Sequence, residues 1–168
     1  MPIKTNAQKA AFCAVFAAIA VALSWLESTI APLLVLPPGV KPGLSNVAVM
    51  FCTSALGLPF GLIVAFLKSI FAGITRGTTA FAMSCGAGLI STCAVGICLR
   101  KRPKYLSLTG IGMLGGVLHN MTQLALAAFV TQTPAIALQL PLLILCGLAS
   151  GAITGTLLRA VRRFFINK

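Results

Sequence analysis

The sequence predicts an all-α integral membrane protein with six transmembrane helices, and composition and segmentation both point to this class. Of the 168 residues, 58% are hydrophobic and only 8% are charged, whereas a soluble domain carries about 25% charged residues. Apolar runs, broken by Pro, Gly or charge, divide the chain into six segments. These lie at about residues 9–30, 43–57, 59–75, 79–99, 106–130 and 137–160. We expect them to form one domain over residues 1–168.

The first three segments need separate justification. The run at 9–30 follows a basic start but is longer than the 7–15 residues typical of a signal peptide, so we expect a retained helix. The runs at 43–57 and 59–75 are shorter than the about 20 apolar residues that cross a bilayer. Pro59, with Gly57 and Gly61 around it, predicts a tight turn between two antiparallel helices.

The net charge of +12 is concentrated in three groups that flank apolar segments. They are Lys4 and Lys9; Arg100, Lys101, Arg102 and Lys104; and Arg159, Arg162, Arg163 and Lys168. With six spans all three groups fall on one side of the membrane, which predicts cytoplasmic N- and C-termini. Because the charge has this distribution, we do not expect nucleic-acid binding.

Polar residues gather at one predicted depth. Glu27 is the only acidic residue and His119 the only histidine. At a rise of about 1.5 Å per residue, ten polar residues fall in the outer half of the membrane or above it. These are Glu27, Lys41, Ser45, Asn46, Lys68, Arg76, Ser84, His119, Asn120 and Gln123. Intramembrane ionisable residues mark functional sites, so this set predicts a substrate-binding cavity open to the outside.

The charges of this set suggest what the cavity binds. Lys41, Lys68 and Arg76 outnumber Glu27, so a ligand with a carboxylate or phosphate would balance them. Ser45 is a candidate N-cap, whose helix start would then face an anion. Three alternatives stay open. Glu27 can form a structural ion pair with Lys68 or His119, Lys41 and Arg76 can extend to lipid headgroups, and residues 119–123 can bond neighbouring helices.

Small residues recur at a spacing of four in three segments. Gly147, Gly151 and Gly155, together with Gly112 and Gly116, predict close helix packing within the chain. The first segment carries Ala10, Ala14, Ala18 and Ala22, for which packing within the chain and docking of a partner are both reasonable interpretations.

Several kinds of chemistry are not expected. The chain has no Asp and no phosphate-binding loop, and its six cysteines lie in apolar runs without ligand spacing. A single Glu cannot hold the metal ions that prenyl transfer normally needs. Acid–base catalysis by Glu27 and His119 is formally possible. We expect a protein that is not an enzyme and needs no metal or cofactor.

Four runs resemble a known bacterial family. "GVKPGLSN" (39–46), "LKSIFAG" (67–73), "GGVLHNMTQL" (115–124) and "LCGLASGAITG" (145–155) resemble heptaprenyl diphosphate synthase component I, also called Gx transporter. The chain departs from the family's pattern at Pro42, where an apolar residue such as Leu is expected, and at Lys68, where Arg is expected.

That family is similar to the substrate-binding S-components of energy-coupling factor transporters. The resemblance implies a multi-pass protein of the bacterial cytoplasmic membrane that binds a small solute such as a vitamin, a flavin or an isoprenoid or quinone precursor. It implies docking of the alanine-rich first helix on a transmembrane coupling subunit driven by two ATPase subunits, and a lid formed by the loop at 37–46. An accessory subunit of polyprenyl diphosphate synthesis and a stand-alone secondary carrier are the alternatives.

Overall fold

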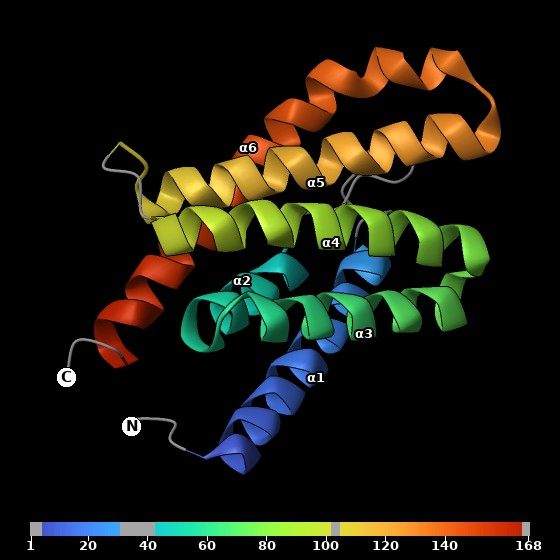
Figure 1. Cartoon of the computed structure of the whole chain (residues 1–168). Helices are drawn as coiled ribbons and strands as arrows, with labels where there is room; N and C mark the ends of the chain where they lie inside the picture. Colours follow the sequence, from blue (N-terminus) through green and yellow to red (C-terminus); the bar gives the residue numbers. More distant parts are fainter. Residues whose placement is uncertain (1–4, 31–42, 102–104, 166–168) are drawn as a thin grey trace.

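The described part of the chain is a bundle of helices (Figure 1). The computed structural model describes residues 5–30, 43–101 and 105–165, and only the backbone of Pro134 and of residues 161–165. The elements are α1 (Asn6–Ile30), α2 (Ser45–Leu56), α3 (Leu58–Arg76), α4 (Thr78–Lys101), α5 (Leu108–Thr131), the 3-10 helix η2 (Pro134–Gln139) and α6 (Leu140–Phe165). No strand occurs in these ranges.

Five helical stretches are long and apolar enough to cross a membrane. They are Asn6–Ile30, Leu58–Arg76, Thr78–Lys101, Leu108–Thr131 and Ala135–Ala160. The prediction of an all-α, multi-pass membrane protein is therefore confirmed. The remaining predicted span, at 43–57, corresponds to α2, which has only 12 residues. Its length is roughly 18 Å, against a hydrocarbon core of about 30 Å.

The turn between α2 and α3 lies where the sequence predicts it. Gly57 separates the two helices at φ 100°, a conformation that a residue with a Cβ rarely adopts. Its N–H donates to the carbonyl of Thr53 at 3.0 Å, which closes the last turn of α2. Pro59 follows in the first turn of α3, where its missing N–H costs no hydrogen bond.

Helices α5 and α6 pack closely through their glycines, as the sequence predicts. A Cβ on Gly112 would lie 2.8 Å from the backbone nitrogen of Gly155, and a Cβ on Gly147 would lie 2.9 Å from the Cα of Val117. Real Cβ atoms do not approach backbone so closely, so only glycine fits at these positions. The glycine spacing therefore serves packing within the chain.

The two faces of α1 differ in their surroundings. Cys13, Ala17 and Ala20 are buried against α2 and α3, and the rings of Phe16 and Phe51 lie 4.8 Å apart across the α1–α2 contact. The alanines at positions 10, 14, 18 and 22 are all exposed on another face. Of the two interpretations of this stripe, packing within the chain is therefore wrong for the described residues.

Figure 1 shows that the basic ends of the helices gather at one end of the bundle. The start of α1 and the end of α6 lie toward the same end as the termination of α4 and the beginning of α5. The turn from α3 to α4 and the turn from α5 to η2 lie at the opposite end, on the right in the view. This arrangement agrees with the predicted grouping of basic residues; which end faces the cytoplasm stays a prediction.

Candidate functional site

A cavity of about 270 Å³ opens between helices α1 to α5. Nine of the ten residues predicted from the sequence line it: Glu27, Ser45, Asn46, Lys68, Arg76, Ser84, His119, Asn120 and Gln123. The tenth, Lys41, lies outside the described residues, as does most of the predicted lid. The structure thus brings residues from five helices to one space, and their role in binding a substrate stays a prediction.

Glu27 lies buried at the start of α2. Its Oε1 accepts the main-chain N–H of Ser45 at 3.1 Å, and its Oε2 accepts the Ser45 hydroxyl at 2.9 Å. A carboxylate at a helix N-terminus is stabilised by the helix dipole and by the free N–H groups there. The prediction that Ser45 is the N-cap is wrong, because Leu44 holds that position. The anion at this helix start is the chain's own Glu27.

Lys68 lies buried on α3 and bonds to the same helix start. Its Nζ donates to Oδ1 of Asn46 at 2.7 Å and to Oγ of Ser45 at 3.4 Å. The Ser45 hydroxyl therefore connects the ammonium group of Lys68 to the carboxylate of Glu27. Charges buried in a membrane protein are stable only when they are paired in this way. The structural interpretation of Glu27 and Lys68 is thus supported, although both side chains also line the cavity.

Arg76 differs from Lys68 in its surroundings. It is the last residue of α3, where a cation interacts favourably with the helix dipole. Its side chain lines the cavity but is exposed. Among the described residues, no side chain or carbonyl forms a hydrogen bond with its guanidinium group.

Helix α5 contributes three polar residues to the cavity lining, His119, Asn120 and Gln123. Nδ2 of Asn120 donates to the carbonyl of Leu143 on α6 at 3.0 Å, and Nδ1 of His119 lies 3.4 Å from the hydroxyl of Ser91 on α4. These contacts support the alternative that this run bonds helices to one another. Gln123 lines the cavity one turn further on, and no hydrogen bond joins its amide to another described residue.

Ser84 completes the predicted set from α4. Its hydroxyl is hydrogen-bonded to that of Ser69 on α3 at 3.2 Å, so it joins two helices at the wall of the cavity.

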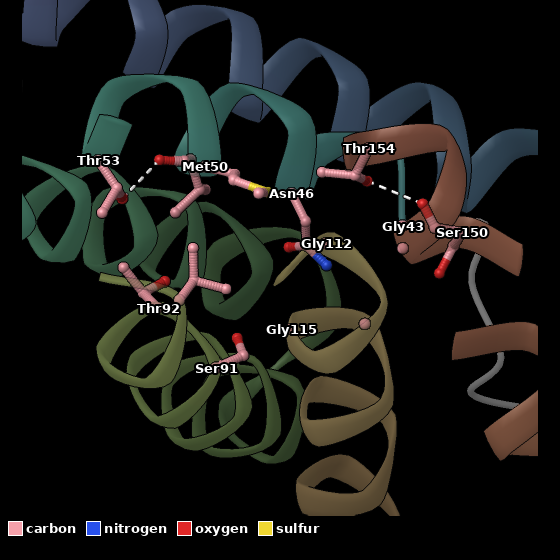
Figure 2. A pocket seen from close by; sticks show the side chains of 14 residues that line it. Gly43, Asn46, Met50, Thr53, Ser91, Thr92, Gly112, Gly115, Ser150 and Thr154 are labelled. Atoms are coloured by element: carbon pink, nitrogen blue, oxygen red, sulfur yellow. Dashed lines mark hydrogen bonds between the residues drawn. The ribbon is translucent and has the colours of Figure 1, made fainter. Parts of the chain in front are cut away.

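A second, much smaller space of about 30 Å³ lies deeper between α2, α4, α5 and α6 (Figure 2). Gly43 and Asn46 line both spaces. The hydroxyls of Thr53 and Thr154 bond to carbonyls of their own helices at 2.8 and 2.9 Å. The buried side chain of Thr92 also lines this space. It is large enough for about one water molecule, and the sequence did not predict it.

Five further residues line the larger cavity without having been predicted. They are Ser24, Gly43, Thr79, Ala80 and Met83. Helical spacing was the available signal, since side chains three or four residues apart share a face. Ser24 lies three residues before Glu27, and Ala80 lies four before Ser84. Their small or uncharged side chains made them inconspicuous within apolar runs.

Comparison with known proteins identifies a family, but no individual protein that is similar to the chain. No curated protein and no solved structure matches the chain. The family model described as heptaprenyl diphosphate synthase component I matches residues 16–161, which include every described residue that lines the cavity. The description names a component of a synthase. In the described residues, no group of three or more His, Cys, Asp or Glu side chains is placed to hold a metal ion. The chain belongs to the heptaprenyl diphosphate synthase component I family.

Proposed function

We propose that the protein is a membrane-embedded solute-binding subunit for the uptake of a small, anionic or amphipathic organic molecule. The observation that carries the proposal is the cavity itself, in which nine polar residues from five separate helices meet. Polar and ionisable groups are costly inside a membrane and are retained there for binding or transport. Its volume of about 270 Å³ is slightly below the 300–1,000 Å³ of typical ligand sites.

The exposed alanines of α1 are consistent with a surface on which a partner subunit docks. Ala10, Ala14, Ala18 and Ala22 leave a smooth face on which another helix can approach closely. The resemblance to S-components suggests that the partner is a transmembrane coupling subunit with two ATPase subunits. On this proposal the protein lies in the bacterial cytoplasmic membrane, and the partners supply the energy of uptake. The solute would be a vitamin, a flavin or an isoprenoid or quinone precursor.

A second candidate function is supported by the family description. A component I of heptaprenyl diphosphate synthesis would anchor a soluble catalytic subunit at the membrane and take no part in the chemistry itself. The exposed face of α1 is compatible with this role too, but the polar cavity is not required for it.

Co-purification separates the two candidates. The protein is expressed in its own host, extracted in a mild detergent and isolated with its bound proteins. Recovery of a coupling subunit and ATPases supports uptake, and recovery of an acidic soluble synthase supports the accessory role. Solute transport by proteoliposomes that lack both ATP and partners would instead indicate a stand-alone carrier.

A further inference from the structure

The cavity has an almost balanced set of formal charges. Among the described residues that line it, Glu27 is negative, while Lys68 and Arg76 are positive. With a neutral His119 the lining therefore carries a net charge of +1. A charge in a space of low dielectric must be balanced closely, because the energy of an unpaired charge is large there. Among the described residues, this sum favours a ligand with a single negative charge.

The two cations are not equivalent. Lys68 already donates to Asn46 at 2.7 Å and to Ser45 at 3.4 Å, and Ser45 in turn donates to Glu27. Its charge is thus neutralised within the wall formed by α1, α2 and α3. Arg76 has no hydrogen-bond partner among the described residues, and its planar guanidinium group suits a carboxylate in a bidentate geometry. Among the described residues, Arg76 is therefore the cation that remains for a ligand.

Uncharged hydrogen-bonding groups lie on α5. The amide of Gln123 has no hydrogen-bond partner among the described residues, so its donor and its acceptor both remain for a ligand. Asn120 uses its Nδ2 on Leu143, which leaves Oδ1 as an acceptor on the same helix. The apolar side chains of Ala80 and Met83 complete the lining from α4. These amide groups can form hydrogen bonds with a ligand that carries a neutral polar group in addition to its anionic group.

Resting on the proposed function, we infer that the solute is a small monocarboxylate with a neutral polar group, and that Arg76 binds its carboxylate. Lys68 positions the start of α2 and does not bind the solute directly. A diphosphate or other polyanion fits less well, because only Arg76 among the described lining residues is a cation without a hydrogen-bond partner in the wall. A neutral molecule fits less well, because it would leave the guanidinium group of Arg76 without an anionic partner.

The test begins with the molecule that the protein retains. Full-length protein is purified from its own host, and the bound compounds are released and identified by mass spectrometry. Thermal-shift titrations then compare benzoate, 4-hydroxybenzoate and indole-3-acetate with their carboxamides, and isopentenyl diphosphate serves as the polyanion. We expect a retained monocarboxylate, and stabilisation by at least one carboxylate but not by its amide.

Variants assign the role of Arg76. Arg76→Gln is expected to weaken carboxylate binding at least about tenfold, because a hydrogen bond to a charged group contributes about 1.5–3 kcal/mol. Arg76→Lys keeps the charge but loses the bidentate geometry, so a smaller loss is expected. Arg100→Gln, which changes an exposed cation at the far end of α4, is the matched control and leaves binding unchanged. The unfolding temperature without ligand shows that each variant is folded.

The results test two claims separately: that the protein binds a solute, and that this solute is a monocarboxylate. A retained diphosphate or neutral molecule, or full retention in Arg76→Gln, overturns the monocarboxylate assignment but leaves a solute-binding protein. If the wild type retains nothing and no probe raises its unfolding temperature, solute binding itself fails, and this inference fails with it.

Discussion

Glu27 and Ser45 are joined by two hydrogen bonds, one from the main-chain N–H and one from the hydroxyl, at 3.1 and 2.9 Å. The end of α1 is thereby attached to the first residue of α2. Lys68 on α3 bonds to the same hydroxyl at 3.4 Å, so three helices meet at one buried polar contact. The contact forms one wall of the cavity and gives the chain's single carboxylate a structural task.

Replacing Glu27 is expected to destabilise the fold. Glu27→Gln removes the charge that balances buried Lys68 and should lower the free energy of unfolding by about 3 kcal/mol. Thermal unfolding in detergent measures the effect. The double variant Glu27→Gln with Lys68→Met should be less destabilised than the sum of the two single variants, because it removes both charges together. Simple additivity would contradict the proposed pairing.

Gly112 is expected to tolerate no side chain. In Gly112→Ala the new Cβ would lie 2.9 Å from the Cα of Gly155, so α5 and α6 must move apart. We expect a loss of about 1–3 kcal/mol in stability, measured as a lower unfolding temperature. Gly110→Ala on the same helix is the control, since its Cβ would make only ordinary contacts at 3.6 Å or more. Equal effects of the two substitutions would argue against close glycine packing.

Gly57 is expected to be required for its backbone conformation. There is space for a Cβ at this position, because the nearest atom, Cδ of Pro59, would lie 3.9 Å away. The backbone of an alanine would nevertheless be strained at φ 100°. Gly57→Ala should therefore cost about 1–3 kcal/mol. Gly88→Ala within α4 should be neutral or stabilising, because its helical backbone suits alanine and its Cβ would lie 3.6 Å from the nearest atom. Circular dichroism during heating compares the two, and a stable Gly57→Ala protein would contradict the prediction.

The exposed stripe of α1 is expected to matter for partners and not for folding. Ala14→Leu adds bulk to an exposed position, so the unfolding temperature and the retained solute should be unchanged. Recovery of the co-purified coupling subunit should fall at least tenfold if α1 is the docking helix. Ala160→Leu, at an exposed position of α6, is the control. Normal partner recovery in Ala14→Leu would remove this face from the proposed interface.

The helices and their order were predictable because lipid imposes strong rules on sequence. A bilayer demands long apolar helices, so the five long helices, the turn at Gly57 and the glycine contacts could be predicted from composition and spacing. Most of the cavity lining was predictable for the same reason, since a residue such as Glu27 or Lys68 is rare in an apolar run. The detailed bonding was not predictable. Nothing in the sequence shows that the carboxylate of Glu27, on another helix, occupies the helix start assigned to Ser45.

The contact between Glu27 and Ser45 also acts as a noncovalent crosslink between two residues that are 18 positions apart in the sequence. For a loop closed in this way the closure entropy grows only with the logarithm of its length, so that doubling the length costs about 0.6 kcal/mol. The crosslink therefore holds the end of α1 against the start of α2 whatever the number of residues between them. Extra residues inserted between Ile30 and Gly43 are therefore expected to cost little stability.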